Sequence, residues 1–292
     1  MSAASAPGPA GSPAGEPRHG VRIAILWAVL TVVAVPLVIW VAGPHIPPYN
    51  NSLQSSDQHT VNVVLLTAAV PIIALIWVFF GYSIAVFRQR GDAIVDGPPL
   101  SADPRIQITW LAITGVLVLA LATYGTVGLY NGSHGAGGGQ GPSPLSKPPA
   151  GSNPLQVQVI GQQWLWTFRY PSYGGVETAT LELPVNRWVE LHVTSLDVDH
   201  SFWAYELGIK ADAIPGSDNV AFVKATKVGQ FQVRCAELCG LWHGHMNDWG
   251  RVVSPTSFVS WIVAREKQYA TITKTLPPFS YIYYPEPIRR AS

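Results

Sequence analysis

A chain of 292 residues could hold one large domain or two of ordinary size. With 48% apolar and only 12% charged residues, it is too hydrophobic for an average soluble protein, so we expect a membrane protein. The formal net charge is only +1 and no run rich in Lys or Arg occurs, which argues against a nucleic-acid partner and against a membrane surface helix held by charge.

The N-terminal part of the chain is predicted to cross a membrane. Three apolar segments contain no Asp, Glu, Lys or Arg: Ile23–Gly43, Val61–Phe87 and Ile106–Tyr130. A helix of about 20 apolar residues crosses the hydrocarbon core of a bilayer. We therefore expect a first membrane helix over 22–43 and a helical hairpin over 61–130, with spans 61–87 and 106–130.

The arginines next to these segments would all lie on one side of the membrane. They precede the first segment or lie between the second and the third, at Arg18, Arg22, Arg88, Arg90 and Arg105. The loop 44–60 contains no Lys or Arg. Positively charged loops stay in the cytoplasm, so we expect residues 1–21 to be cytoplasmic and everything after Tyr130 to lie outside. The Ala, Gly, Pro and Ser residues that dominate this N-terminus predict that it is disordered.

The first apolar segment has a second interpretation, because a basic stretch followed by an apolar run also describes a signal peptide. Its apolar run is longer than the core of a typical signal peptide. No convincing Ala-x-Ala-like cleavage site precedes Pro44. We therefore favour an uncleaved anchor over 22–43.

The remainder of the chain is predicted to form a linker, a β domain and a tail. Residues 131–154 are rich in Gly and Pro and predict a flexible linker. From Leu155 apolar and polar residues alternate, which is typical of a half-buried strand. Further strands are expected at Thr178–Leu183, Arg187–Thr194, Val220–Lys224 and Gln230–Arg234, and a helix at Phe258–Arg265. Short strands with Gly and Pro between them predict an all-β sandwich or barrel over 155–266. Residues 267–292 are expected to be an extension that contacts a partner subunit.

The strongest chemical signal is the run Cys235-Ala-Glu-Leu-Cys239-Gly-Leu-Trp-His243-Gly-His-Met246, which contains the only two cysteines. Thiolate, imidazole and thioether are soft donors that suit copper. A metal site also needs a ligand that ties this loop to the sheet. His200, in Asp197-Val-Asp-His200-Ser, follows a predicted strand and is the candidate.

Several alternatives compete with a copper pair. A disulfide between Cys235 and Cys239 is chemically permitted outside the membrane. Zinc would use two Cys and two His, but a thioether has little role there. A mononuclear blue-copper site needs one thiolate, so the second would be surplus. Two thiolates, two imidazoles, one Met and a backbone carbonyl suit two coppers bridged by both sulfurs.

At these residues the chain resembles subunit II of the haem-copper cytochrome c oxidases, which carries the dinuclear CuA centre. The resemblance covers about residues 60 to 265. Three motifs carry it besides the cysteine loop: Gly161-Gln-Gln-Trp164-Leu-Trp166-Thr-Phe-Arg-Tyr170, Asp197-Val-Asp-His200-Ser and Gly208-Ile-Lys210-Ala-Asp212-Ala-Ile-Pro-Gly216. It implies a cupredoxin-like Greek-key β-barrel or sandwich carried on the 61–130 hairpin.

The resemblance also implies a role for each matching residue. Cys235 and Cys239 would bridge the coppers, His200 and His243 would be the terminal ligands, and Met246 would be a weak ligand to one copper. Glu237 would give its carbonyl oxygen to the other copper. Its carboxylate would reach a magnesium ion at the boundary with subunit I, a hard ion that prefers oxygen. Lys210 and Asp212 would support that boundary.

Trp164 matches the surface tryptophan through which cytochrome c is thought to deliver electrons. Taken alone it would be read as a core aromatic. Trp166 is expected to point the same way by the period of a strand, so the sequence does not separate the two. His245 departs from the family, which usually has an uncharged residue there. It could compete as a ligand, although we expect His243 to bind.

The implied function is electron transfer in an oxidase whose oxygen chemistry takes place in subunit I. Cytochrome c would be a separate partner, because no Cys-x-x-Cys-His haem attachment motif is present. Other partners would be subunit I, further oxidase subunits and membrane lipid, in the plasma membrane of a bacterium with the copper domain on the outer face. Two rivals are a quinol oxidase subunit, which lacks copper ligands, and a membrane-tethered module that stores or delivers copper.

Overall fold

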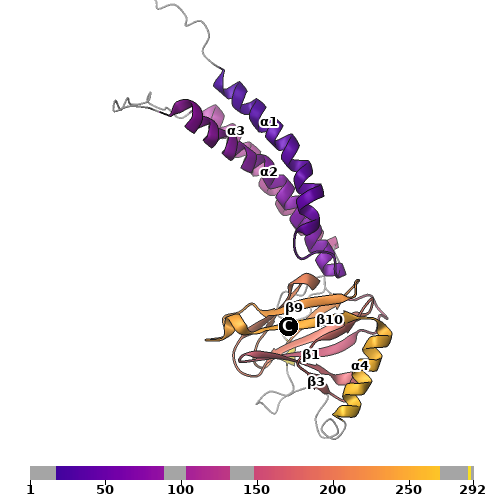
Figure 1. The fold of residues 1–292 in the computed structure, drawn as a ribbon. Coiled ribbons are helices and arrows are strands. Elements are labelled where there is room, and N and C mark those ends of the chain that lie inside the picture. Colours follow the sequence, from indigo (N-terminus) through magenta and orange to yellow (C-terminus); the bar gives the residue numbers. More distant parts are fainter. Residues whose placement is uncertain (1–17, 89–102, 132–147, 270–288, 291–292) are drawn as a thin grey trace, which may run out of the picture. The chain divides into compact units, whose positions relative to one another are not determined.

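A computed structural model describes residues 18–88, 103–131, 148–269 and 289–290 (Figure 1). The chain divides into two compact units, residues 1–41 with 66–100, and residues 42–65 with 101–292. The predicted disorder of 1–17, most of the predicted linker 131–154 and most of the predicted extension 267–292 lie outside the described residues.

Three long apolar helices make up the N-terminal part of the described chain. Helix α1 spans His19–Leu37 and continues through a π-helical turn, Val38–Ala42, and a 3-10 turn, Gly43–His45. Helix α2 spans Leu53–Phe87 and α3 spans Pro104–Asn131. Candidate membrane spans of 27, 35 and 25 residues occur at His19–His45, Leu53–Phe87 and Pro104–Gly128. Each is longer than the roughly 20 residues that a bilayer core requires.

Within the first unit, polar side chains join α1 to α2. The indole nitrogen Nε1 of Trp27 donates a hydrogen bond to the carbonyl oxygen of Pro71, 2.8 Å away. His19 Nδ1 lies 2.7 Å from the hydroxyl of Tyr82. A polar group in hydrocarbon requires a partner within the protein, and these two contacts supply one for each side chain.

The β domain is built from two sheets. The first has the order β11-β8-β5-β1-β2-β3, and the second has the order β4-β10-β9-β6-β7. The first contains β1 (Leu155–Gln162), β2 (Leu165–Tyr170), β3 (Val176–Thr178), β5 (Trp188–Ser195), β8 (Ser217–Lys224) and β11 (Arg289–Arg290). The second contains β4 (Glu182–Pro184), β6 (His200–Ala204), β7 (Ile209–Ala213), β9 (Gly229–Cys235) and β10 (Asn247–Val253). Pairing is antiparallel except for β1 with β5, β4 with β10 and β8 with β11.

The core of this domain lies between the two sheets. Its largest buried side chains include Trp166, Phe168, Tyr170, Phe202, Phe231 and Phe258. The hydroxyl of Tyr170 on β2 accepts a hydrogen bond from the backbone nitrogen of Glu182 on β4 and donates one to its carbonyl oxygen, each at 2.9 Å. Tyr170 therefore joins the two sheets. Apolar helices followed by an all-β sandwich confirm the predicted fold class.

One predicted strand is wrong. Thr178–Leu183 was expected to be continuous, but β3 ends at Thr178 and β4 begins at Glu182, and the two strands belong to different sheets. The hydroxyl of Thr178 donates to the carbonyl oxygen of Thr180 at 2.9 Å, in the bend where the chain changes sheet. Strands β2, β6, β7 and β10 were not predicted from the sequence.

Helix α4 (Pro255–Gln268) follows β10 and covers one end of the core (Figure 1). Its N-terminus is capped by Ser254, whose hydroxyl accepts from the backbone nitrogen of Ser257 at 3.1 Å. Phe258 and Ile262 are its buried residues. The helix begins three residues before the predicted Phe258 because Pro255 is favourable in the first turn.

The start of α2 is part of the second unit and binds the β domain. Ser52 donates from its hydroxyl to the carbonyl oxygen of Leu207 at 2.6 Å, and Gln58 donates from its side-chain amide to the carbonyl oxygen of Gly208 at 2.8 Å. Gln54 accepts from the backbone nitrogen of Lys224 at 3.2 Å. Helix α2 begins at Leu53, and its polar residues 54–60 precede the predicted apolar span, which was expected to begin at residue 61. We name residues 51–58, which include the start of α2, the docking turn.

Candidate metal centre

Two neighbouring strands of the second sheet position the first two candidate ligands. His200 is the first residue of β6, and Cys235 is the last residue of β9. The antiparallel register places Phe202 opposite Cys235, and the backbone nitrogen of Ala236 donates to the carbonyl oxygen of Ser201 at 2.9 Å. The sheet thus brings the upstream histidine to the start of the cysteine loop.

The loop from β9 to β10 folds back on itself and brings in the other donors. The backbone nitrogen of Cys235 donates to the carbonyl oxygen of Met246 at 3.1 Å, which closes the loop. Gly240 has a φ of +116°, a backbone conformation that residues other than glycine rarely adopt. His243–His245 forms a 3-10 turn just before Met246.

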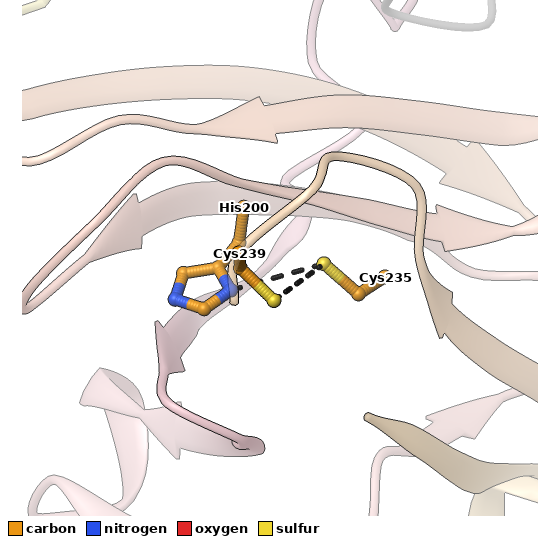
Figure 2. A group of neighbouring side chains, drawn as sticks. All are labelled: His200, Cys235 and Cys239. Carbon is orange, nitrogen blue, oxygen red and sulfur yellow. Dashed lines mark hydrogen bonds between the residues drawn. The ribbon is translucent and has the colours of Figure 1, made fainter. Parts of the chain in front are cut away.

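The predicted donors converge. The sulfur atoms of Cys235 and Cys239 are 3.7 Å apart, and His200 Nδ1 is 3.8 Å from the sulfur of Cys235 (Figure 2). Their ligand atoms all lie within 4.8 Å of one another. On the other side, Cys239 sulfur lies 3.6 Å from His243 Nδ1 and 3.8 Å from Met246 sulfur. The carbonyl oxygen of Glu237 is 3.2 Å from the sulfur of Cys235.

These distances fit the donors of a metal pair. A thiolate bond to a first-row metal such as zinc is about 2.3 Å, so two donors on one ion lie at most about 4.6 Å apart. The five contacts to a cysteine sulfur, at 3.2, 3.6, 3.7, 3.8 and 3.8 Å, are below that limit. The donors are soft sulfur and imidazole groups, which suit copper. Every predicted ligand is therefore close enough to share a metal with a bridging thiol.

Burial differs within the donor set. His200, Cys239 and Met246 are buried, whereas Cys235 and His243 are partly exposed. Burial raises the pKa of the Cys239 thiol, and the neighbouring Cys235 sulfur raises it further. Burial also raises the pKa of Cys235, but its hydrogen bond with His200 and further hydrogen bonds outweigh that effect and lower it. A metal binds cysteine as the thiolate, so metal binding to this pair releases thiol protons.

The structure separates the two tryptophans that the sequence could not. Trp164 is partly exposed, and its Nε1 donates to the carbonyl oxygen of Cys239 at 3.2 Å. Trp166 is buried on β2, edge-on to Phe202 and His200 at centroid distances of 5.6 and 5.9 Å. The expectation that both point the same way is wrong, because β1 ends at Gln162 and β2 begins at Leu165, so Trp164 lies in the turn between strands.

The remaining predicted residues have side chains at the surface. Glu237, Lys210, Asp212 and His245 are exposed. Asp212 on β7 accepts from the hydroxyl of Ser201 at 2.7 Å, beside His200. The ring of His245 lies 5.2 Å from that of Trp242, centroid to centroid. Asp212 thus lies on β7 opposite Ser201, the residue after the candidate ligand His200, and Lys210 lies on the same strand opposite Trp203.

Two contacts of Asp197 were not predicted from the sequence. Asp197 Oδ1 lies 2.9 Å from His200 Nε2, and Asp197 Oδ2 accepts from the backbone nitrogen of Gln163 at 2.7 Å. Burial raises the pKa of Asp197, but these hydrogen bonds outweigh it and lower the pKa. The signal that could have revealed the first contact is a carboxylate three residues before the ligand histidine.

Comparisons with known proteins show which family the chain resembles. The family "Cytochrome C oxidase subunit II, periplasmic domain" matches residues 177–249. Cytochrome c oxidase subunit 2 of Synechocystis sp. is 30% identical over 274 residues, covering 82% of this chain and 81% of that protein. The protein of the same name from Thermostichus vulcanus is 30% identical over 294 residues, covering 87% and 89%. A crystal structure of the periplasmic domain of subunit II of cytochrome oxidase of Bradyrhizobium japonicum is 34% identical, covers 39% of this chain and 95% of that one, and has a TM-score of 0.38.

The fold and the donor set define a membrane protein whose β domain carries a soft-metal centre. The chain belongs to the cytochrome c oxidase subunit 2 family. It is therefore a subunit of an oxidoreductase complex with other subunits, and the predicted family and function are confirmed. A CuA-type copper centre in a periplasmic domain agrees with the family and with the Cys and His cluster.

Proposed function

We propose that this subunit accepts electrons from cytochrome c and relays them to haem in subunit I, where oxygen is reduced. The proposed ligands of a dinuclear copper centre are His200, Cys235, the carbonyl oxygen of Glu237, Cys239, His243 and Met246. The observation that carries the proposal is the 3.7 Å separation of the two sulfurs, with an imidazole nitrogen next to each. A zinc site or a single blue copper leaves part of this set unused.

When bound, the copper pair would supply a one-electron redox couple between the donor protein and the haem. The chain's contribution is a set of donors that the fold brings together and partly buries. His200 is held on a strand and fully buried, while the loop of Cys239 and Met246 is closed by a backbone hydrogen bond. Ligands fixed in advance need little rearrangement when charge changes. Trp164, hydrogen-bonded to Cys239, is the residue that we propose receives the electron.

A magnesium ion shared with subunit I is a further part of the proposal. The side chain of Glu237 is exposed while its carbonyl oxygen faces Cys235, so one residue can serve both the copper loop and a partner surface. Its carboxylate is the kind of oxygen ligand that magnesium prefers. Asp212, bonded to Ser201, and exposed Lys210 would support this boundary.

We also propose that the protein lies in the plasma membrane of a bacterium. The N-terminus would be cytoplasmic and the copper domain would be on the outer face, with lipid around the apolar helices. The Arg residues before the first helix and between the second and third support this orientation. The described helices are long and apolar enough to span. The bonds from α1 to α2 support retention of the first helix as an anchor.

The test is to purify the full chain in detergent, load it with copper, count the metal and record its electron paramagnetic resonance spectrum. We expect two coppers per chain that share one unpaired electron. Cys239→Ser and His200→Ala should each abolish that signal. One copper with a four-line spectrum, or a preference for zinc, would contradict the proposal. A chain that binds two coppers but transfers no electrons in the assembled oxidase would favour copper delivery instead.

A further inference from the structure

One carboxylate lies between a copper ligand and the electron-receiving turn. The ring of His200 is fully buried between the sulfur of Cys235, 3.8 Å from Nδ1, and the carboxylate of Asp197, 2.9 Å from Nε2. A neutral imidazole has one protonated nitrogen and one with a free lone pair. An acceptor at Nε2 holds the proton there and leaves Nδ1 for the metal.

The carboxylate of Asp197 is itself held in place by the loop around it. The backbone nitrogen of Val198 donates to Oδ1 at 2.7 Å. The backbone nitrogen of Asp197 donates to the hydroxyl of Ser195 at 3.2 Å, and that hydroxyl donates to the carbonyl oxygen of Val198 at 2.5 Å. These local bonds fix the carboxylate, so that it can orient the ring of His200 rather than follow it.

The second oxygen of Asp197 holds the turn that contains Trp164. The backbone nitrogen of Gln163 donates to Oδ2 at 2.7 Å, and the side-chain amide of Gln163 donates to the carbonyl oxygen of Cys239 at 2.8 Å. The indole of Trp164 donates to the same carbonyl oxygen. Gly240 leaves room for both groups, since a Cβ there would lie 3.1 Å from the amide nitrogen of Gln163 and 3.3 Å from the indole.

A continuous set of hydrogen bonds therefore runs from His200 through Asp197 and Gln163 to the carbonyl of Cys239. We propose that Asp197 is a positioning residue that fixes the His200 ligand and the Gln163–Trp164 turn together, so that the electron-receiving indole and the metal keep one geometry. Gln163 extends this role to Cys239. The inference rests on the proposed copper function and adds residues that position its ligands.

The matched pair Asp197→Asn and Asp199→Asn tests this role in the assembled oxidase. Both remove one negative charge from an exposed residue of the same loop, but Asp197 is the one that contacts His200 and Gln163. Copper content, the resonance spectrum, the midpoint potential and the rate of electron transfer from reduced cytochrome c are measured. Removing a group that orients a metal ligand typically costs about 10- to 100-fold in affinity or activity. We expect Asp197→Asn to shift the spectrum and the potential and to slow electron transfer by about that factor.

Asp199→Asn should change only the KM for cytochrome c and its dependence on salt, as loss of an exposed charge does. Gln163→Met, which keeps the backbone bond to Asp197 but loses the side-chain donor, should slow electron transfer without changing copper content. This variant tests the link from Asp197 through Gln163 to Cys239 even if Asp197→Asn does not fold. A spectrum, potential and rate in Asp197→Asn equal to those of Asp199→Asn, or an unchanged rate in Gln163→Met, would overturn the inference. A wild-type chain without a copper pair would instead overturn the proposed function.

Discussion

The indole nitrogen of Trp164 donates a hydrogen bond to the carbonyl oxygen of Cys239, 3.2 Å away. A partly exposed aromatic side chain is therefore hydrogen-bonded to the loop between β9 and β10 that contains the candidate ligands. Trp166, two residues later, is buried in the core and edge-on to Phe202. The two tryptophans of one motif therefore have different roles. One connects the surface to the donor set, and the other packs behind His200.

Trp164→Phe should slow electron transfer from cytochrome c while the domain stays folded and keeps its copper. Phenylalanine keeps the aromatic ring but loses the hydrogen bond to Cys239. We expect the rate to fall by at least about tenfold, a barrier increase of about 1.4 kcal/mol. Stopped-flow reduction of the oxidase by reduced cytochrome c measures this rate.

The control is Trp242→Phe, which changes a 51%-exposed tryptophan of the cysteine loop whose ring lies at a tilt beside that of His245. It should leave the transfer rate within about twofold, an effect of about 0.4 kcal/mol. Equal losses in the two variants would show that the exposed aromatic surface, rather than the bond to Cys239, matters for transfer.

The ligands could be predicted from the sequence, whereas most of the groups that hold them could not. Cys, His and Met are unusual side chains, and their spacing within one loop restricts which chemistry they can perform. The groups that orient them include the backbone nitrogen of Gln163 and the carbonyl oxygen of Cys239. Every residue except proline has both groups, so only the fold reveals which ones meet.

Strand periodicity had a similar limit. It identified β1, β5, β8 and β9, but only β9 alternates in burial, because β1, β5 and β8 are buried on both faces over most of their length. It did not show where a strand stops. The turn between Gln162 and Leu165, which takes Trp164 out of the alternation, depends on the pairing of β1 with β2. The change of sheet after Thr178 depends on the pairing of β4 with β10, far along the chain.

His245→Ala should leave both coppers and the resonance signal unchanged, whereas His243→Ala should abolish the signal. His243 Nδ1 lies 3.6 Å from the sulfur of Cys239, while the side chain of His245 is exposed beside Trp242. Metal analysis and electron paramagnetic resonance of the two purified variants measure the difference. Loss of the signal in His245→Ala would mean that the ligand assignment within this turn is reversed.

Gly208→Ala should destabilise the β domain by more than about 2 kcal/mol, because it combines backbone strain with a clash. Gly208 has a φ of +66°, and a Cβ there would lie 2.7 Å from the backbone nitrogen of Ser55 in the docking turn. Backbone atoms cannot move aside as a flexible side chain can. Denaturant unfolding of the full chain in detergent, followed by tryptophan fluorescence, measures the free energy of unfolding.

The control for this variant is Gly216→Ala. Gly216 also has a positive φ, +78°, but nothing lies within 4 Å of its Cβ position. Alanine there should cost only the strain of a left-handed conformation, about 1–2 kcal/mol. If Gly208→Ala costs no more than Gly216→Ala, then the docking turn does not pack on Gly208 as described.

Glu182→Gln should make the stability of the metal-free domain less dependent on pH. Burial raises the pKa of Glu182 above the ordinary 4.5, although the nearby guanidinium of Arg251 opposes the shift. A carboxyl with a raised pKa stabilises the folded state fully below the pKa of the unfolded chain, and this stabilisation is lost as pH rises through the higher pKa of the folded protein. Glutamine resembles the protonated form at every pH and keeps an oxygen that accepts from Arg251. The variant should therefore match the wild type near pH 4 and become relatively more stable as the pH rises above 4.5.

Free energies of unfolding, measured by denaturant titration at several pH values, test this prediction for Glu182→Gln. Asp199→Asn is the control for the loss of one exposed carboxylate. A wild-type chain that gains stability relative to Glu182→Gln as the pH rises would show that the ion pair with Arg251 outweighs the cost of burial.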